Sequence, residues 1–320
     1  MLRYIIRRLI IVIPTLLGIT VIVQLFITIT PGDPARLMLG NEVPEEEVEA
    51  LRVEMGLRDP FPVRYYNYIT GIIFRGDFGK SFRTKRTVMI EILQRFPYSL
   101  MLVAISLSIA VLAGIPIGIY AATHQYSWKD NLAIFASLFC VSMPGFWFSL
   151  MLIQILCIRI NLLPPSGISN WTGWILPSIT GALGFAASIA RQMRSSLLEV
   201  IRQDYITTAR AKGQSERLVL YRHALKNAVI PVIMVVGGMF GMAMGGSMIA
   251  EVIFSIPGLG SYTLSALTSR DYPVIQTSVL FMSTLFAIVL LLIDVAFAIV
   301  DPRIRAQYAR KKKKLEGGAA

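Results

Sequence analysis

Residues 204–227 form a polar and basic stretch between two long apolar runs. They begin with Asp204-Tyr205-Ile206-Thr207-Thr208-Ala209-Arg210-Ala211-Lys212-Gly213 and, after nine further residues, end with His223-Ala224-Leu225-Lys226-Asn227. The spacing of Ile206, Ala209 and Arg210 places them on one helical face. Gly213 permits a backbone conformation that other residues resist. The stretch therefore predicts two short helical segments that are hinged at this glycine.

The composition around this stretch is that of a membrane protein. Hydrophobic residues make up 55% of the chain and charged residues only 16%, whereas charged residues make up about 25% of an ordinary soluble domain. Six runs have the length and the apolar character of a membrane span. These are residues 9–30, 98–122, 132–158, 174–190, 228–254 and 274–300. We therefore predict an all-α, polytopic membrane protein with six transmembrane helices.

Two of these runs carry helix-breaking residues. Pro144-Gly145 lies midway along the third run and predicts a kink, because proline removes a backbone hydrogen bond and clashes with the preceding turn. The fourth run contains Pro177, Gly181 and Gly184. Small residues of this kind favour a helix that is packed inside a bundle over one that faces lipid.

The distribution of basic residues orients the spans. With the N-terminus inside, nineteen basic residues fall on the cytoplasmic side and only Arg159 and Arg270 lie in the short outer loops. This asymmetry follows the positive-inside rule and places both termini in the cytoplasm. The first run is too long for the apolar part of a secretory signal, so we expect it to be retained as a span. The topology explains most of the net charge of +12 and leaves no soluble basic face for nucleic acid.

The predicted topology divides the chain into four parts. Residues 1–30 hold the N-terminal tail and the first span, and residues 31–97 form an extracytoplasmic insert. Residues 98–300 form the transmembrane permease domain, with a cytoplasmic loop at 191–227, and residues 301–320 form a basic cytoplasmic tail. In the insert, Pro44 followed by acidic residues predicts a helix start. An amphipathic run at 61–73 predicts a second helix. The insert either receives a solute-binding protein or caps the bundle.

The loop at 191–227 resembles the coupling loop of permease subunits of binding-protein-dependent ABC importers, in their dipeptide, oligopeptide and nickel branch. That family's general pattern is Glu-Ala-Ala, three residues, Gly, nine residues and then Ile-x-Leu-Pro. Ala209, Gly213 and Leu225 match it. Four positions depart from it: Thr207, Thr208, His223 and Lys226. The amino-acid sequence of the loop nevertheless resembles that of the peptide branch, and the similarity extends over nearly the whole chain.

The resemblance implies a permease subunit that forms the translocation path of an ATP-driven importer in the bacterial cytoplasmic membrane. It implies a second homologous permease in a heterodimer, two cytosolic ATPase subunits and an extracytoplasmic solute-binding protein as partners. Peptide-like solutes are the implied cargo, while a nickel chelate, glutathione or an opine remain alternatives because the binding protein imposes most selectivity. The implied ATPase coupling residues are Asp204, Tyr205, Thr208, Ala209, Arg210, Ala211, Lys212, Gly213, His223 and Leu225. A secondary transporter or channel without ATPase partners is the alternative from another class.

Two further groups of residues are candidates for the translocation path or its gate. Gly237, Gly241 and Gly245 recur every four residues and give the fifth span a smooth face. This face is either a packing seam or a lining of the path or of the subunit interface. Glu251, followed by Pro257 and Gly258, is either a gate or a carboxylate that partners within the chain satisfy. Asp294 in the sixth span favours a counter-ion or packing role.

Patterns of catalysis are missing from the sequence. Phe78-Gly79-Lys80-Ser81 resembles the end of a phosphate-binding loop, but Phe74 stands where that motif requires its first glycine. His124 and His223 have no metal-ligand spacing to Cys or carboxylate residues. We therefore predict a non-catalytic membrane subunit without a cofactor or a metal, whose ATP is hydrolysed by partner subunits.

Overall fold

The computed structural model describes residues 2–40 and 42–300, so the predicted basic tail at 301–320 lies outside the described residues. Every regular element in this part of the chain is a helix, and the only β pairing is one isolated bridge between Lys80 and Thr87. The chain divides into two compact units, Met1–Thr30 with Val279–Ala320, and Pro31–Ser278. We call these unit 1 and unit 2.

Unit 1 contains α1 (Leu2–Ile29) and the part of α13 (Tyr272–Val300) that follows Ser278. Its two helices are joined by an ion pair, in which Arg8 Nη2 lies 3.1 Å from Asp294 Oδ2. This pairing gives the acid of the sixth predicted span the counter-ion that its apolar surroundings require.

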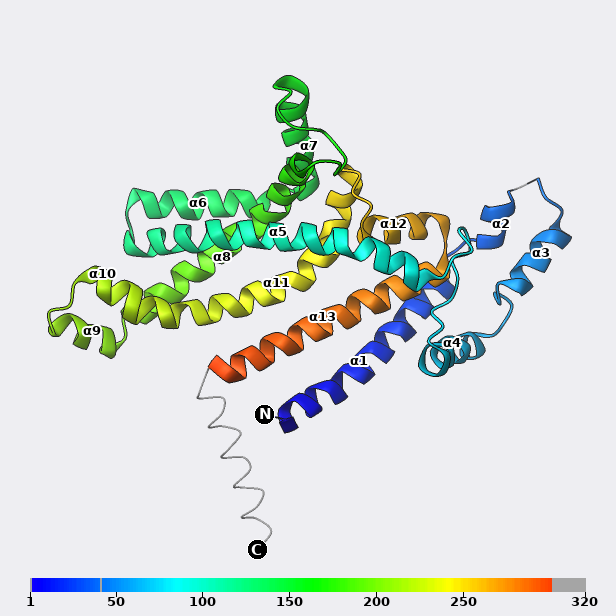
Figure 1. Cartoon of the computed structure of the whole chain (residues 1–320), viewed down its shortest axis with the longest axis horizontal. Helices are drawn as coiled ribbons and strands as arrows, with labels where there is room; N and C mark the ends of the chain where they lie inside the picture. The colour runs from blue at the N-terminus through cyan, green and yellow to red at the C-terminus, as the bar shows by residue number, and fades with distance from the viewer. Residues whose placement is uncertain (1, 41, 301–320) are drawn as a thin grey trace, which may run out of the picture. The chain divides into compact units, whose positions relative to one another are not determined.

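Unit 2 begins with four short helical elements and continues as a helix bundle (Figure 1). The first group is α2 (Pro34–Leu39), α3 (Glu45–Glu54), α4 (Phe61–Thr70) and η1 (Gly71–Arg75). The bundle contains α5 (Val88–Thr123), α6 (Trp128–Ser142), α7 (Gly145–Leu152), η2 (Ile153–Arg159), η3 (Trp171–Trp174), α8 (Ile175–Ile201) and α11 (Leu225–Ile253). Between α8 and α11 lie α9 (Asp204–Ala211), α10 (Glu216–Leu218) and η4 (Val219–Ala224), and α12 (Leu259–Ser269) follows α11.

The predicted membrane fold is confirmed by helix length and composition. Five helices in the described part of the chain qualify as spans: Arg8–Ile29, Val88–Thr123, Trp171–Ile201, Glu216–Ile253 and Tyr272–Val295. A sixth is obtained if Trp128–Ser142 and Gly145–Arg159 form one broken span. The second span begins at Val88 instead of residue 98, because α5 continues through Pro97.

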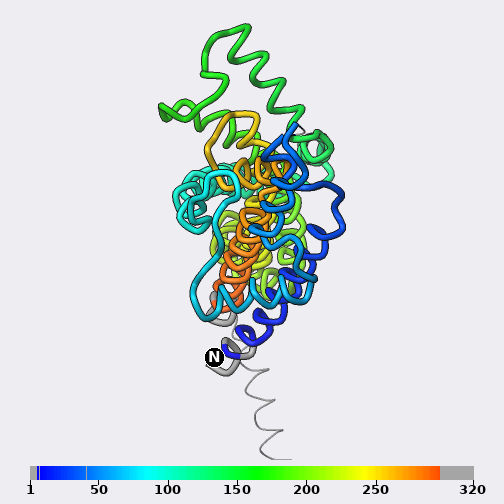
Figure 2. Tube along the Cα trace, turned by 90° about the vertical axis from the view of Figure 1, so that its right-hand side faces the viewer, coloured from blue at the N-terminus to red at the C-terminus, as the bar shows by residue number. Residues whose placement is uncertain are grey.

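The third span is broken where the sequence predicts a kink. α6 and the helical segment after it meet at Met143 and Pro144 with a bend of 97°. Figure 2 shows the green segment after this break standing clear of most other helices of unit 2. A proline in the middle of a helix explains the interruption, but the angle is far larger than that of an ordinary kink.

α5 and α8 approach each other closely through two glycines. A methyl group added at Gly114 would stand 2.6 Å from the Ala186 carbonyl oxygen, and one at Gly118 would stand 2.5 Å from that of Ala190. Only glycine allows such an approach, because a Cβ atom would overlap the facing backbone. α8 is also the most enclosed candidate span, with 44% of its most apolar window buried. It is therefore the inner helix that its small residues predict.

Candidate functional site

The chain between α8 and α11 folds into a hook, residues 204–224, at the end of the bundle that lies away from α12 (Figure 1). Within it, α9 contacts η4. Ile206 and Ala209 on α9 are buried, with exposed fractions of 0% and 7%, and Val219 and Ala224 on η4 are buried as well. Helices of this length are marginal in isolation, so this small apolar core holds the hook together.

Polar contacts close the turn of the hook. The Arg210 guanidinium donates to both carboxylate oxygens of Glu216, with Nε–Oε1 at 2.8 Å and Nη2–Oε2 at 3.3 Å. Gly213 lies between them with φ +77°, a left-handed conformation that suits glycine. At the base of the hook, Asn227 Nδ2 donates to the Tyr205 hydroxyl at 2.8 Å. The hook is therefore shaped by contacts among its own residues and with the start of α11.

The structure separates the predicted coupling residues into an outer and an inner set. The outer set is exposed and consists of Asp204, Tyr205, Thr208, Arg210, Ala211, Lys212 and Gly213. Ala209 belongs to the inner set, because it packs in the core of the hook. The spacing of Ile206, Ala209 and Arg210 along α9 therefore does not give them one environment: the first two are buried, whereas Arg210 is exposed.

The two remaining coupling candidates lie where the hook joins α11. His223 in η4 is half-buried, and its Nε2 has no hydrogen-bond partner among the described residues. Leu225 is the first residue of α11 and is half-buried. These two side chains belong to the base of the hook and not to its exposed face.

A buried ion pair holds α8 against α6 below the hook. Arg194 Nε and Nη2 donate to Asp130 Oδ1 and Oδ2, both at 2.6 Å, and Asp130 is only 1% exposed. The Tyr126 N–H donates to the same carboxylate at 3.0 Å. A buried carboxylate needs this degree of pairing. Because α9 begins shortly after α8 ends at Ile201, the pair fixes the helix on which the hook is mounted.

At the other end of α11, Glu251 is enclosed completely, with an exposed fraction of 0%. Its Oε1 accepts hydrogen bonds from the hydroxyls of Ser99 at 2.6 Å and Ser247 at 3.1 Å, and its Oε2 accepts one from the Ser261 N–H at 2.8 Å. We call these four residues the Glu251 cluster. They join α5, α11 and α12, which is the arrangement that the alternative of a satisfied carboxylate predicts.

The two other candidates beside this cluster differ in exposure. Gly258 is buried, and a methyl group added to it would stand 2.4 Å from the Glu251 carboxylate, so a glycine is needed there for packing. Pro257 is exposed. Gly258 therefore supports the Glu251 cluster, whereas Pro257 is available at the surface of the described chain.

The segment that resembles a phosphate-binding loop holds a carboxylate of this chain. Asp271 Oδ2 accepts a hydrogen bond from the Ser81 hydroxyl at 2.5 Å, and its Oδ1 accepts one from the Phe82 N–H at 3.0 Å. The Arg83 N–H also donates to Asp271, at 3.3 Å. Asp271 is 4% exposed. Consecutive backbone amides are natural anion ligands, and here they tie the start of α13 to the chain before α5.

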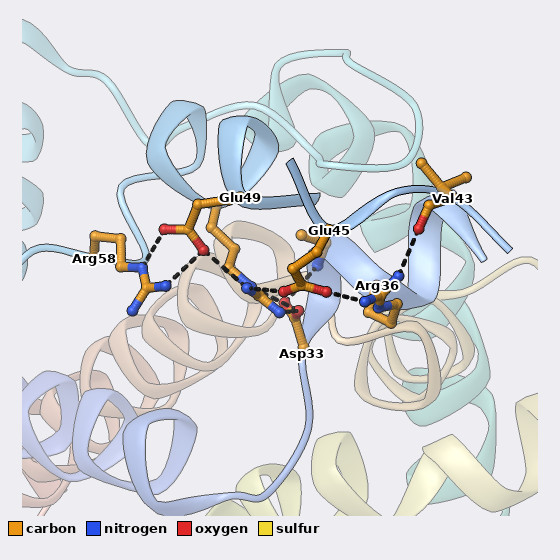
Figure 3. A network of polar contacts seen from close by, with 8 residues as sticks. Asp33, Arg36, Val43, Glu45, Glu49 and Arg58 are labelled. Atoms are coloured by element: carbon orange, nitrogen blue, oxygen red, sulfur yellow. Dashed lines mark hydrogen bonds and ion pairs between the residues drawn. The ribbon is translucent and has the colours of Figure 1, made fainter. Parts of the chain in front are cut away.

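A network of alternating charges joins α2 and α3 (Figure 3). Arg52 at its centre donates to Asp33 at 2.8 Å, to Glu45 at 2.6 Å and to Glu49 at 2.8 Å. Arg58 donates twice to Glu49, both times at 2.5 Å. Hydrogen bonds from Arg58 and then from Arg52 lower the pKa of Glu49 to about 2. The network therefore stays charged and paired at neutral pH.

The candidate glycine face of α11 is exposed at one of its three glycines. Gly245 is exposed, and a methyl group added to it would meet no atom within 4 Å. Gly237 and Gly241 are half-buried. The same four-residue spacing at Gly114 and Gly118 is the one that packs two helices of this chain together. Reasoning from the sequence missed that seam and singled out a face that is exposed at Gly245 and half-buried at Gly237 and Gly241.

Two family models match almost the whole chain. Residues 114–306 match the family described as binding-protein-dependent transport system inner membrane component. Residues 1–103 match the N-terminal membrane component of binding-protein-dependent transport systems. Both matches agree with the resemblance that the loop at 191–227 carries.

Relatives and solved structures point in the same direction. The glutathione transport system permease protein GsiC of Salmonella typhimurium is 42% identical over 305 residues, which cover 95% of this chain and 99% of that protein. Its counterpart in Escherichia coli K12 is 40% identical with the same coverage. The inward-facing MetNI methionine ABC transporter matches 67% of this chain and 97% of its own, with a TM-score of 0.57 and 16% identity. At that identity the match shows the fold alone.

Proposed function

Because the chain belongs to the binding-protein-dependent inner membrane component family and is a permease subunit of an ABC importer, we propose that it conducts glutathione or similar small peptides into the cell. As a member of the peptide, glutathione and nickel branch, it works with ATPase subunits and a solute-binding protein and does not hydrolyse ATP itself. Identity of 42% to glutathione permeases over 305 residues carries the choice of cargo.

The proposed orientation places both termini and the hook in the cytoplasm. It rests on the nineteen basic residues that this orientation assigns to the inner side. Residues 1–30, 31–97, 98–300 and 301–320 are then the first span with its tail, the extracytoplasmic insert, the permease domain and the cytoplasmic tail. The insert, with its charge network, faces the solute-binding protein.

The hook is proposed to dock into a groove of a cytosolic ATPase. Its exposed face offers an aromatic residue, Tyr205, together with Thr208 and the cations Arg210 and Lys212. Its own core and the Arg210–Glu216 pair make it stiff enough to transmit a displacement. The Asp130–Arg194 pair passes that displacement from α8 to α6. Closure of the ATPases then moves the bundle between inward and outward openings.

A second, homologous permease is proposed to complete the path as a heterodimer. One hook engages one ATPase, whereas the family machinery holds ATP between two ATPase subunits, so two hooks are needed. The uncovered face at Gly245, with the exposed Met242 and Ile249 beside it, is a surface that allows close approach of another helix. The subunit stoichiometry of a gently purified complex tests this: two copies of this chain without another permease would overturn the heterodimer.

Uptake measured in proteoliposomes tests the cargo. The permease pair with its ATPases is reconstituted, the binding protein is added outside, and labelled glutathione, a nickel chelate and an opine are compared. We expect uptake of glutathione that requires ATP and the binding protein. Uptake of the nickel chelate or the opine alone would replace the cargo, and uptake without ATPases would contradict the importer mechanism.

A further inference from the structure

Residues 80–87 form a turn before α5 that carries four cations, Lys80, Arg83, Lys85 and Arg86. We call these residues the basic turn. All four cations are exposed, and none of them forms an ion pair within residues 2–40 and 42–300. By contrast, every arginine of the charge network that joins α2 and α3 is paired with a carboxylate. The basic turn is therefore the part of the insert whose charge is available to another molecule.

The backbone of the basic turn is fixed by contacts that do not involve its cationic side chains. An antiparallel bridge joins Lys80 to Thr87 across the turn. Asp271 at the start of α13 accepts hydrogen bonds from the Ser81 hydroxyl and from the next two main-chain N–H groups. A partner that binds a pre-ordered surface does not have to order it first, which favours binding.

The tip of the basic turn holds a cation in an unfavourable backbone conformation. Lys85 has φ +59°, a left-handed conformation that residues with a side chain adopt at a cost. Its N–H donates to the Ser81 carbonyl at 3.0 Å, which closes the turn. Backbone strain of this kind is concentrated at functional sites. A lysine therefore stands where the backbone alone favours glycine.

The carboxylates beside the basic turn are bonded to neutral donors. Glu91 is 3% exposed and accepts hydrogen bonds from the hydroxyls of Thr84 at 3.1 Å and Tyr262 at 2.5 Å. Asp271 is 4% exposed and is held by the turn itself. Asp77 accepts a hydrogen bond from a main-chain N–H at 2.9 Å. These acids leave the exposed side chains of the turn without a direct counter-ion among the described residues.

In the proposed orientation, α5 carries the basic turn beyond the outer surface of the bilayer. The apolar run of the second span starts at residue 98, whereas α5 begins at Val88. Residues 88–97 rise about 15 Å at 1.5 Å per residue, and the headgroup layer on each side of a bilayer is about 5–8 Å thick. Physiological salt screens exposed charges over about 8 Å. This position favours a protein partner over lipid headgroups.

We propose that the basic turn docks against an acidic surface of the extracytoplasmic solute-binding protein. Attraction between surfaces of opposite charge speeds the encounter of two proteins and fixes their relative orientation. The inference rests on the proposed orientation and on the binding protein as a partner. It adds the residues of this chain that receive the binding protein and the sign of the charge that they recognise.

A neutral variant tests this contact. It combines Lys80→Gln, Arg83→Gln, Lys85→Asn and Arg86→Gln, because asparagine tolerates the left-handed conformation at position 85. The matched control combines Lys80→Arg, Arg83→Lys, Lys85→Arg and Arg86→Lys, which changes the same four side chains and keeps their charge. The complete permease–ATPase complex is placed in nanodiscs of uncharged phosphatidylcholine. Biolayer interferometry then measures its affinity for the solute-binding protein.

We expect the dissociation constant to rise about tenfold in the neutral variant, because four modest surface ion pairs are lost together. The control should bind like the unaltered complex. Added salt should weaken binding by the unaltered complex and should have less effect on the neutral variant, since screening acts on exposed charges.

Carbodiimide coupling identifies the partner groups, because this reagent joins lysine amines to carboxylates in direct contact. Mass spectrometry of the unaltered complex with the bound solute-binding protein should detect Lys80 or Lys85 joined to an aspartate or glutamate of that protein. Lys226 is the control, since it is exposed and lies on the cytoplasmic side in the proposed orientation. It should give no such product.

The outcomes separate this proposal from the proposed function. Equal affinity of the neutral variant and the unaltered complex, with ATP-dependent uptake intact, overturns the docking site and leaves the importer assignment unchanged. A loss that occurs only in nanodiscs with anionic phosphatidylglycerol assigns the basic turn to lipid headgroups and also overturns it. Absence of both binding and uptake with the unaltered complex overturns the proposed function together with the docking site. Loss of affinity in the neutral variant alone, with cross-links from Lys80 or Lys85, supports the proposal.

Discussion

The hook and the Glu251 cluster lie at opposite ends of α11 and treat their polar groups in opposite ways. In the Glu251 cluster, both carboxylate oxygens accept hydrogen bonds from this chain and the acid is 0% exposed. In the hook, the apolar Ile206 and Ala209 are buried while the charged residues are exposed. At one end of the helix the polar groups are therefore buried and paired, and at the other the polar and charged side chains are exposed.

This contrast predicts that substitutions in the Glu251 cluster affect stability, whereas substitutions in the hook affect the proposed coupling to the ATPase. A substitution in the Glu251 cluster leaves buried donors without an acceptor and acts on the free energy of unfolding. A substitution on the outer face of the hook disturbs no buried group, so we expect its effect to fall on the proposed ATPase contact. The two regions should therefore respond differently in stability and in transport assays.

The largest effect on stability is expected from Glu251→Ala. It leaves the Ser99 hydroxyl and the Ser261 N–H without their acceptor and opens a cavity, so the free energy of unfolding should fall by about 3 kcal/mol. Glu251→Gln, which keeps the size and one oxygen acceptor, should lose less. Thermal unfolding of the purified complex measures both. A wild-type melting temperature for Glu251→Ala would mean that the cluster is not structural.

A somewhat smaller loss is expected from Gly118→Ala. The new methyl group would stand 2.5 Å from the Ala190 carbonyl oxygen, and overpacking of this kind costs about 1–3 kcal/mol. Gly245→Ala is the control, because its methyl group meets no atom within 4 Å and should change stability by less than about 0.5 kcal/mol. Equal losses in the two variants would show that both glycine seams pack within this chain.

Gly213→Arg is expected to abolish transport at a small cost in stability. A side chain at φ +77° strains the backbone by about 1–2 kcal/mol, and the long cation obstructs docking of the hook. Gly213→Ala is the control: it has the same backbone strain but no long side chain, and its methyl group would meet no atom within 4 Å. Membrane abundance and ATP-dependent uptake are measured together. Undiminished uptake with Gly213→Arg would remove the hook from the coupling mechanism.

The smallest effect concerns the charge network of the insert. The pKa of Glu49 is lowered from 4.5 to about 2, so its stabilising contribution is complete above pH 4.5 and is lost as the pH falls through about 2. Hydrogen exchange should therefore report a constant opening of α3 between pH 6 and pH 4.5 and an increasing opening as the pH falls from 4.5 toward about 2. In Glu49→Gln the protection should be lower and independent of pH in this range. Opening of α3 in the unaltered chain that stays constant as the pH falls below 4.5 would show that the Arg52 and Arg58 contacts do not hold.

Much of the fold was predictable because long apolar runs leave few alternatives to membrane helices. Pro144 indicated the break in the third span, although a local pattern does not determine an angle of 97°. Pro97 was misleading as a boundary, since α5 begins at Val88 and tolerates a proline inside the helix. The first and last residues of a helix depend on contacts with other parts of the chain, which its own apolar sequence does not reveal.

The polar sites were less predictable because their partners are distant along the chain. Glu251 is held by Ser99, and the amides beside Ser81 are held by Asp271. No spacing rule connects such pairs. The hook was found because its residues are adjacent in sequence, but the inward direction of Ala209 follows only from its contact with η4.

Photo-crosslinking from two exposed positions tests the central claim most directly. A photoreactive residue is placed at Thr208 on the hook or at Glu46 on α3, both of which are exposed, and the complete transporter is irradiated in intact cells. We predict that position 208 yields an adduct with the ATPase subunit and that position 46 yields adducts only with proteins outside the membrane. An ATPase adduct from position 46, or its absence from position 208, would contradict the account.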